Sequence, residues 1–423
     1  MSDAPLPRSL LPDTAVVRDD DLEIGGVSLR DLAAVYGTPL FVYDEATLRS
    51  RAREAASGFD DGVAYATKAF LCGAMARLAY EEGLCLDVAT GGELDLVLRS
   101  GVPASRVIVH GNNKSLEEIE RAVELGVHRL VVDNFDEIDR IAATLSAGRA
   151  LDCLVRVTPG VEAHTHEYVR TGQEDTKFGF SLASGDARRA ISRLRALPGV
   201  SLHGVHAHIG SQIFEVTGFV ETMGILAEFI ADDDFDELCV GGGLGVAYVE
   251  GESAPSITDW ARAVRAAAGS AGLDPGMRLL GEPGRAVVAQ AAVTLYRVGA
   301  VKPVEARTYM AVDGGMSDNP RPVLYGSGYE AFDVAAPLAP RPQRVRLVGK
   351  HCESGDVLID EADLPASTGV ASLIATPVTG AYGYSMASNY NRVPRPPVIF
   401  VADGAAREVL RRESLDDLAR LEV

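Results

Sequence analysis

From Val63 onward the chain alternates short β-rich apolar runs with amphipathic helical stretches, and glycine or polar turns separate them. Ser115–Leu125 is typical of the helical stretches, because its apolar residues recur at the spacing that places them on one helix face. It also opens with a Ser-x-x-Glu pattern, which predicts a capping box at the helix start. Asp186–Leu197 and Thr258–Ala271 predict helices in the same way.

The β-rich runs between these helices predict eight strands. They are Val63–Lys68, Cys85–Ala89, Val107–Gly111, Leu130–Asp133, Cys153–Val157, Leu202–His208, Leu238–Gly243 and Leu279–Glu282. Eight strands, each followed by a helix, predict a closed (β/α)8 TIM barrel. An open doubly wound sheet would also alternate strands with helices, but the count of eight favours closure.

After about Val288 the helical periodicity fades, and β-branched residues, proline and glycine dominate. This texture predicts a second, mostly antiparallel β domain. Its expected strands include Val293–Val298, Tyr309–Val312, Arg344–Val348 and Val398–Val401. Because Thr38–Asp44 is also strand-like, the β domain is expected to take in the N-terminus. We therefore predict a barrel over residues 45–288 and a β domain made of residues 1–44 and 289–423.

The formal net charge is −20, from 60 acidic and 40 basic residues. So acidic a chain argues against nucleic acid or an anionic membrane as a partner, because phosphate groups would be repelled. An anionic substrate must therefore meet locally placed arginines. The acidic residues between Asp232 and Glu237 predict a solvated loop more readily than a metal site.

Five cysteines lie apart without a CxxC pair, which fits a reducing compartment and not a disulfide framework. The first residues lack a basic flank followed by an apolar stretch, so no signal peptide is expected. No apolar run approaches the roughly 18 residues that span a bilayer. We therefore expect a cytoplasmic protein.

Polar residues stand where the predicted barrel strands end. These residues are Lys68, Asp87, His110 with Asn112, Asp133, Arg156, His208, Gly241–Gly243 and Glu282. Active sites of TIM barrels lie at the carboxyl ends of the strands, so we expect these side chains to converge on one mouth.

Lys68 is the first candidate for chemistry. A lysine at a strand end is commonly a surface residue with a buried stem, but a desolvated amine can form a Schiff base. Pyridoxal phosphate also needs a carboxylate for its ring nitrogen, donors for its phosphate and a cover for its ring face. Glu282, the glycine run Gly241–Gly245 with Ser211, and His208 are the candidates for these roles. Metal binding by His206 and His208 is the less favoured alternative, because no carboxylate or cysteine pattern accompanies them.

Nine short segments in order carry a resemblance to a known family. They are Tyr65–Lys68, Asp87–Glu93, His110–Lys114, His164–His166 with Thr176–Gly179, His208–Ser211, Gly241–Gly245, Glu282–Arg285, Cys352–Asp356 and Gly380–Tyr382. With them the chain resembles the alanine-racemase-type (fold type III) pyridoxal-phosphate decarboxylases, and in particular the diaminopimelate decarboxylases. The resemblance covers about Leu32 to Gly404.

The resemblance implies that pyridoxal phosphate is bound covalently at Lys68 and that Cys352 donates a proton across a homodimer interface. It implies two further sets of site residues. The cofactor set is Lys68, Asp87, His208, Ser211, Gly242, Gly243, Glu282, Gly284, Arg285 and Tyr382, and the substrate set is Arg285, Arg321, Tyr325, Glu353 and Tyr382. A buried cysteine would be the plain alternative for Cys352, but its polar neighbours indicate a loop tip.

The implied reaction is decarboxylation of meso-2,6-diaminopimelate to L-lysine and CO2. Two alternatives stay open. One is a decarboxylase of the same fold that acts on another basic amino acid or on carboxynorspermidine. The other is a catalytically silent homologue that binds partners, against which the intact Lys68 and Cys352 argue.

Overall fold

The structure, a computed structural model, describes residues 8–145, 148–161 and 176–423. The chain divides into two compact units. The barrel unit comprises Arg51–Gly245 and Ala254–Ala286, and the β unit comprises Met1–Ser50, Val246–Ser253 and Val287–Val423. That Val246–Ser253 groups with the β unit is a detail that the sequence did not indicate.

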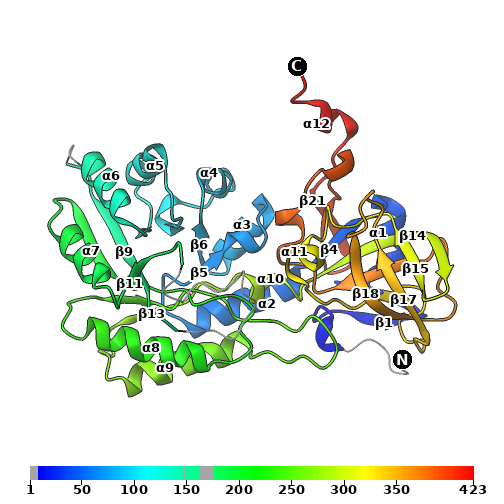
Figure 1. The fold of residues 1–423 in the computed structure, drawn as a ribbon, viewed down its shortest axis with the longest axis horizontal. Helices are drawn as coiled ribbons and strands as arrows, with labels where there is room; N and C mark the ends of the chain where they lie inside the picture. The colour runs from blue at the N-terminus through cyan, green and yellow to red at the C-terminus, as the bar shows by residue number, and fades with distance from the viewer. Residues whose placement is uncertain (1–7, 146–147, 162–175) are drawn as a thin grey trace. The chain divides into compact units, whose positions relative to one another are not determined.

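The barrel unit is built on eight parallel strands (Figure 1). In sheet order they are β5 (Ala64–Ala66), β6 (Cys85–Val88), β7 (Val107–Val109), β8 (Arg129–Val132), β9 (Leu151–Thr158), β11 (Val200–His206), β12 (Glu237–Cys239) and β13 (Arg278–Leu280). The backbone N–H groups of Ala64 and Ala66 donate to the carbonyls of Gly281 and Pro283 at 3.0 and 3.1 Å. These bonds join β5 to the segment after β13, so the predicted closed barrel is confirmed.

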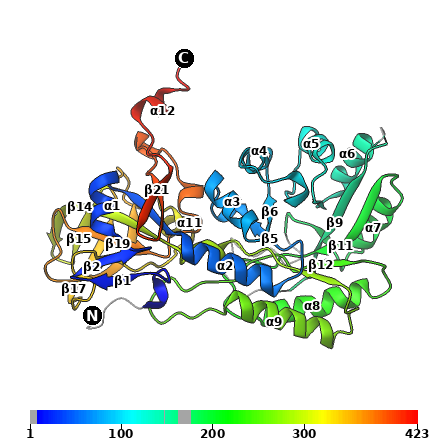
Figure 2. The ribbon, with the colours of Figure 1, turned by 180° about the vertical axis from the view of Figure 1, so that it is seen from behind.

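Helices follow the strands on the outside of the barrel (Figures 1 and 2). They are α3 (Gly73–Glu81), α4 (Gly91–Arg99), α5 (Leu116–Leu125), α6 (Phe135–Leu145), α7 (Asp186–Arg195), α8 (Thr217–Ile230) and α9 (Ile257–Ser270). The predicted capping box of α5 is present: Ser115 accepts from the Glu118 N–H, and the Glu118 carboxylate accepts from the Ser115 N–H. Inside the barrel, one apolar cluster joins Ala64, Cys85, Ile108, Val131, Leu154, Cys239 and Leu280.

The β unit contains a mixed, mostly antiparallel sheet. Its main strands, in order, are β18 (Val357–Leu364), β17 (Gln343–Val348), β15 (Arg307–Val312), β14 (Ala292–Val304), β4 (Leu40–Asp44), β20 (Val398–Ala402) and β21 (Ala405–Leu410), while β19 (Leu373–Pro377) and β16 (Phe332–Asp333) extend from β14. Only two of its pairs, β4 with β20 and β15 with β17, are parallel among the described residues. The N-terminal strand β4 lies between β14 and β20, so the N-terminus joins this sheet as predicted.

Three features differ from the sequence predictions. Most barrel strands end earlier than predicted, as β5 does at Ala66 and β12 at Cys239, because the residues that follow turn away from the strand ladder, whereas β9 runs on to Thr158. A small sheet of β1 (Val16–Arg18), β2 (Asp21–Ile24) and β3 (Val27–Ser28), followed by α1 (Leu29–Tyr36), was not predicted. The predicted stretch His164–His166 lies outside the described residues.

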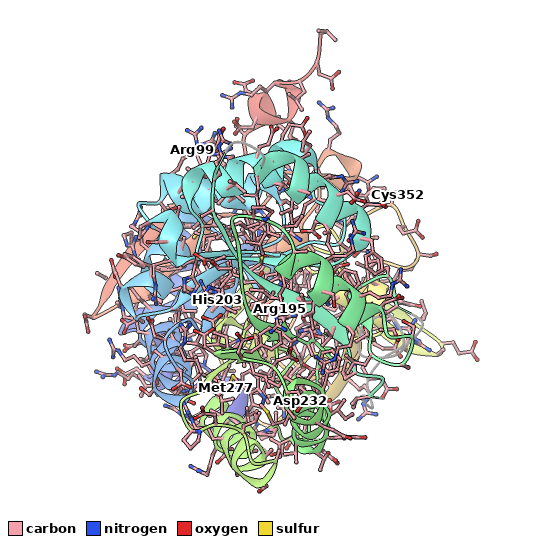
Figure 3. The ribbon with its side chains drawn as sticks, turned by 90° about the vertical axis from the view of Figure 1, so that its left-hand side faces the viewer. Arg99, Arg195, His203, Asp232, Met277 and Cys352 are labelled. Atoms are coloured by element: carbon pink, nitrogen blue, oxygen red, sulfur yellow. The ribbon has the colours of Figure 1, made fainter. Side chains whose placement is uncertain are left out.

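The prediction of a solvated loop was wrong for Glu237. This residue begins β12 and is fully buried, and its carboxylate pairs with the guanidinium groups of Arg129 and Arg278. Its acidic neighbours are nearer the surface, where Asp233 pairs with Arg195 at 3.0 Å and Asp236 pairs with His203 at 3.0 Å. Figure 3 labels Arg195 and His203 together with Asp232 of the same acidic segment. Among the described residues, no helix is long and apolar enough to cross a membrane.

Candidate active site

The centre of the candidate site is the carboxylate of Glu282, two residues past the end of β13. His110, immediately after β7, places its Nε2 3.0 Å from Glu282 Oε1. His206, the last residue of β11, places its Nε2 2.9 Å from Glu282 Oε2. The two imidazole rings meet edge to face with centroids 4.9 Å apart. All three side chains are buried, so strands far apart in the sequence bring together one carboxylate and two hydrogen-bond donors.

The neighbours of Glu282 decide its charge. Burial would raise the pKa of Glu282, but the charges and hydrogen bonds of His110 and His206 outweigh burial and hold that pKa well below its usual range. Burial lowers the pKa of His206 to about 4, against the opposing effect of Glu282. At neutral pH the site therefore holds an ionised Glu282 beside a neutral His206.

His110 lies between two acids. Its Nε2 is 3.7 Å from Asp87 Oδ1 on β6, in addition to its contact with Glu282. Burial alone would lower the pKa of His110, yet the carboxylates of Asp87 and Glu282 prevail and raise it. Burial raises the pKa of Asp87 to about 6, with His110 acting in the opposite direction. The two carboxylates thus favour the protonated form of His110, whose charge compensates theirs.

A glycine-rich loop follows β12. The Gly242 N–H donates to His208 Nδ1 at 3.1 Å, so a neutral His208 carries its proton at Nε2. Burial, Lys68 and Arg156 hold the pKa of His208 well below its ordinary value. A Cβ added to Gly242 would lie 2.2 Å from the Glu282 carbonyl oxygen, and one added to Gly243, whose φ is +109°, would lie 2.2 Å from that of Gly210. Only glycine fits this close backbone approach.

The cationic and hydroxyl groups of the mouth come from two further turns. Arg285 is buried and donates from Nη2 to Ser211 Oγ at 2.9 Å. Gly284 packs closely on Ala66, where an added Cβ would lie 3.0 Å from the Ala66 Cβ. Lys68 lies two residues beyond that point in a short 3-10 turn, Thr67–Ala69, and its side chain is exposed.

A buried ion pair holds two of the strand-end loops and was not assigned a role from the sequence. Lys114 Nζ donates to Glu137 Oε1 at 2.8 Å and to the carbonyls of Gly111 and Val131 at 2.8 and 2.7 Å. Glu137 also accepts from the Asp133 N–H at 2.9 Å. Lys114 belongs to the segment His110–Lys114, which was the one signal in the sequence that could have indicated this role.

In the β unit, Arg321 begins α11 (Arg321–Tyr325) and is buried. Its Cζ lies 4.1 Å from the ring centroid of Tyr248, and its Nη1 donates to Tyr329 Oη at 2.6 Å. No ion pair of the described residues involves Arg321. Tyr325, at the other end of α11, is half-buried.

The predicted loop tip at Cys352 is confirmed, since both Cys352 and Glu353 are exposed between β17 and β18. The Cys352 N–H donates to Asn391 Oδ1 at 3.1 Å. The preceding residue, His351, is buried and places its Nε2 2.8 Å from Ser317 Oγ. Tyr382, also of the β unit, is half-buried and has a left-handed φ of 58°.

The barrel residues fit pyridoxal phosphate on chemical grounds. They supply a lysine amine, an ionised carboxylate for a ring nitrogen, a neutral imidazole for a ring face, and a glycine loop with serine and arginine for a phosphate. His110, His206 and Glu282 are also close enough to hold a metal ion, but both Nε2 atoms already hydrogen-bond the carboxylate. His206 and His208, the other pair considered for a metal, have different partners: His206 hydrogen-bonds Glu282, and His208 accepts from the Gly242 N–H.

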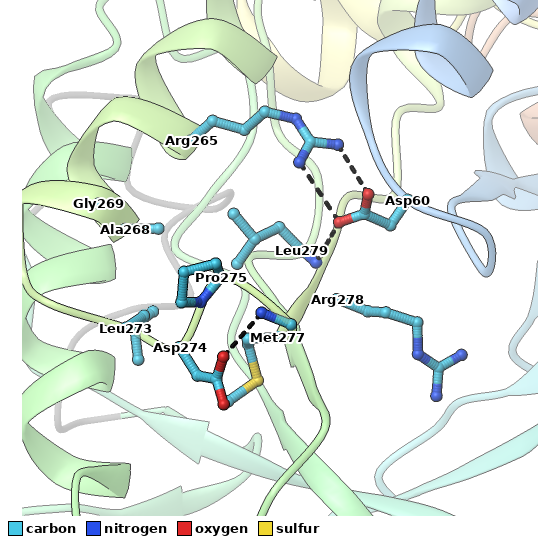
Figure 4. Close-up of a pocket in the computed structure, with 11 residues that line it drawn as sticks. Asp60, Arg265, Ala268, Gly269, Leu273, Asp274, Pro275, Met277, Arg278 and Leu279 are labelled. Carbon is cyan, nitrogen blue, oxygen red and sulfur yellow. Dashed lines mark hydrogen bonds and ion pairs between the residues drawn. The ribbon is translucent and has the colours of Figure 1, made fainter.

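A separate pocket at the opposite end of the barrel strands does not share these groups (Figure 4). It lies beside Arg278, where β13 begins. Two of its charged side chains pair with each other, since Arg265 Nη2 lies 3.0 Å from Asp60 Oδ1, and Asp60 also accepts from the Leu279 N–H at 2.7 Å. Arg278 pairs with Asp236 and Glu237 instead.

Comparisons with known proteins agree with this chemistry. Residues 45–289 match the family model described as pyridoxal-dependent decarboxylase, pyridoxal binding domain. Diaminopimelate decarboxylase of Halalkalibacterium halodurans is 48% identical over 419 residues, covering 95% of each chain, and that of Bacillus subtilis is 46% identical over 420 residues with the same coverage. The crystal structure of the M. jannaschii diaminopimelate decarboxylase with L-lysine superposes with a TM-score of 0.90 at 30% identity, covering 97% of this chain and 98% of that one. The chain therefore belongs to the diaminopimelate decarboxylase family of pyridoxal-dependent enzymes.

Proposed function

We propose that this chain decarboxylates meso-2,6-diaminopimelate to L-lysine and CO2, with pyridoxal phosphate held at the carboxyl ends of the barrel strands. The observation that carries this proposal is the ionised, buried Glu282 in the same strand-end cluster as Lys68 and His208. The relatives named diaminopimelate decarboxylase, and the crystal structures of two such enzymes with L-lysine, support the choice of substrate and product.

Each barrel residue has a role that follows from its chemistry. Pyridoxal phosphate, when bound, accepts the electron pair that the departing carboxylate leaves behind. Lys68 attaches it, and the Glu282 anion keeps a proton on its ring nitrogen. His208 would cover a ring face, while Ser211, Arg285 and the backbone of Gly242 and Gly243 would bind its phosphate. Asp87 and Gly284 of the barrel unit, with Tyr382 of the β unit, would complete its surroundings.

The residues of the β unit would recognise the substrate. Arg321 is a buried cation without an acidic partner among the described residues, so its planar guanidinium can bind the distal carboxylate of diaminopimelate bidentately. Exposed Glu353 suits the distal ammonium group. Tyr325 and Tyr382 of the β unit, with Arg285 of the barrel unit, would complete the set. Cys352 would return a proton to the carbon that lost CO2.

We further propose a homodimer in which Cys352 of one subunit serves the site of the other, acting in the cytoplasm. A reducing compartment keeps the exposed Cys352 thiol available as a proton donor. Mixing two inactive variants, Lys68→Ala and Cys352→Ala, tests whether Cys352 acts in its own subunit or in the partner.

The decisive experiment measures CO2 release by the purified protein from meso-diaminopimelate, lysine, ornithine and arginine, together with absorbance at the visible edge. We expect bound cofactor and a clear preference for meso-diaminopimelate. A preference for ornithine or lysine would contradict the proposed substrate but not the proposed decarboxylase activity. Cofactor absorbance without turnover of any substrate would instead indicate a silent homologue.

A further inference from the structure

Glu282 has a third partner besides the two histidines. Cys239, the last residue of β12, is buried in the barrel interior, and the charge of Glu282 and a hydrogen bond with its side chain help to raise the pKa of the Cys239 thiol. His110, His206 and Cys239 thus reach one carboxylate from three different strands, with the two Nε2 distances at 3.0 and 2.9 Å. None of the three belongs to the residues proposed to contact the cofactor or the substrate.

Cys239 also connects Glu282 to the glycine-rich loop. Its Sγ accepts a hydrogen bond from the Gly241 N–H at 3.4 Å, while the Glu282 N–H donates to the Gly241 carbonyl at 2.7 Å. A thiol can accept and donate at the same time. The sulfur therefore links the start of the proposed phosphate-binding loop to the carboxylate that would face the ring nitrogen of the cofactor.

The Cys239 thiol and His206 are both in a protonation state that allows them to donate to the Glu282 carboxylate. Burial, followed by the charge of Glu282, raises the pKa of the Cys239 thiol well above its ordinary value, so the S–H proton is retained. His206 is neutral and donates through Nε2. A buried carboxylate without such donors would take up a proton. With one histidine on each oxygen, each oxygen still has a further lone pair for other donors.

We infer that His110, His206 and Cys239 are positioning residues that keep Glu282 ionised and oriented for the cofactor ring, and that Cys239 also fixes the glycine-rich loop against it. This inference rests on the proposed cofactor site. Cys239 would then hold the carboxylate in place as well as packing in the apolar cluster.

Two matched pairs of variants test the inference. Cys239→Ala removes the thiol donor, and Cys239→Ser keeps a donor of similar size. His206→Leu removes the N–H donor, and His206→Gln keeps one at similar reach. Cys85→Ala is the control, because Cys85 is a buried thiol of the same apolar cluster without this hydrogen bond. For each purified apoprotein we would measure the Kd for pyridoxal phosphate and the absorbance spectrum of the bound cofactor across pH.

Loss of a hydrogen bond to a charged group corresponds to about a 10- to 100-fold change. We therefore expect His206→Leu to weaken cofactor binding by about that factor, and Cys239→Ala by about 3- to 10-fold. Both should move the pH at which the cofactor spectrum changes. His206→Gln and Cys239→Ser should stay within about threefold of the parent, and Cys85→Ala should lower the thermal midpoint without changing the Kd.

The inference would be overturned if Cys239→Ala and Cys239→Ser weakened cofactor binding equally. It would also be overturned if Cys239→Ala and His206→Leu kept the parental Kd and spectrum. If His206→Leu does not fold, the cysteine pair and His206→Gln decide. A parental protein that binds pyridoxal phosphate but releases no CO2 from meso-diaminopimelate would contradict the proposed function alone, because the binding comparison does not depend on turnover.

Discussion

Single side chains of this protein take their protonation from burial and from one or two immediate neighbours. Glu282 and Asp87 are both buried carboxylates, yet the pKa of one is lowered and that of the other is raised to about 6. The difference comes from the neighbours. The charges and hydrogen bonds of two histidines act on Glu282, whereas Asp87 stands 3.7 Å from one histidine and is also raised by the charge of Glu282.

Lys68 should carry the cofactor. Borohydride reduction of the holoprotein followed by peptide mapping is expected to place the pyridoxyl group on the peptide with Lys68. Lys114 is an unsuitable site, because its amine is buried and satisfied by Glu137 and two carbonyls. Label on Lys114 or Lys177 would refute the assignment.

Arg321 should govern recognition of the distal carboxylate. Leaving a buried charged group unpaired costs roughly 2–5 kcal/mol, so Arg321→Ala should lower kcat/KM for meso-diaminopimelate on the order of 30-fold to several thousandfold. Arg321→Lys should restore only part of this, because an ammonium lacks the planar fork. Rates with lysine, which has no second carboxylate, should change little. An equal drop for both substrates would assign Arg321 to the fold.

His128 should make the protein sensitive to acid. Burial, helped by Arg129, lowers the pKa of His128 to about 4, whereas an unfolded histidine titrates near 6.5. The unfolded chain therefore binds more protons between these values, and stability is lost as the pH falls from about 6.5 to about 4. In His128→Gln, urea unfolding should show a shallower loss over this window, by at most about 2–3 kcal/mol. An unchanged pH profile would contradict the assignment.

At the scale of elements, a buried ion pair joins strands across the barrel. Arg129 on β8 and Glu237 on β12 are both buried and form a bidentate contact, with Arg278 of β13 pairing to the same carboxylate at 2.5 Å. Such a pair is weak evidence for net stability, but breaking it leaves an uncompensated buried charge.

Glu237→Gln should therefore lower the free energy of unfolding by about 3–5 kcal/mol in urea titrations. The exposed pair of Arg344 and Asp363, 3.1 Å apart, is the matched control, and Asp363→Asn should change stability by less than about 1 kcal/mol. Similar effects of the two substitutions would mean that the buried pair does not hold the barrel strands.

At the scale of the whole molecule, the two residues proposed for the chemistry belong to different units, Lys68 to the barrel unit and Cys352 to the β unit. If these residues come from different subunits, mixing inactive Lys68→Ala with inactive Cys352→Ala protein should restore up to about a quarter of the parental activity, as random exchange in twofold dimers predicts. The measurement is CO2 release after subunit exchange has been verified by mass. No recovery would place both residues within one chain.

The sequence by itself determined the eight strands and their helices, the β domain with its N-terminal strand and the identity of the residues that stand where the barrel strands end. These are local properties, because periodicity, turn residues and short motifs depend on neighbours along the chain. It also placed Cys352 correctly in a loop, from its polar neighbours.

Only the tertiary structure decided which of these residues meet. Glu282 lies 172 positions from His110 and 76 from His206 along the chain, and barrel closure brings the three into hydrogen-bond contact. Barrel closure also buries Glu237, which was predicted to be solvated because its neighbours along the chain are acidic. It places the Cys239 thiol beside Glu282, so that this buried cysteine has a polar neighbour. Burial and pKa depend on neighbours in space, and a linear pattern does not contain them.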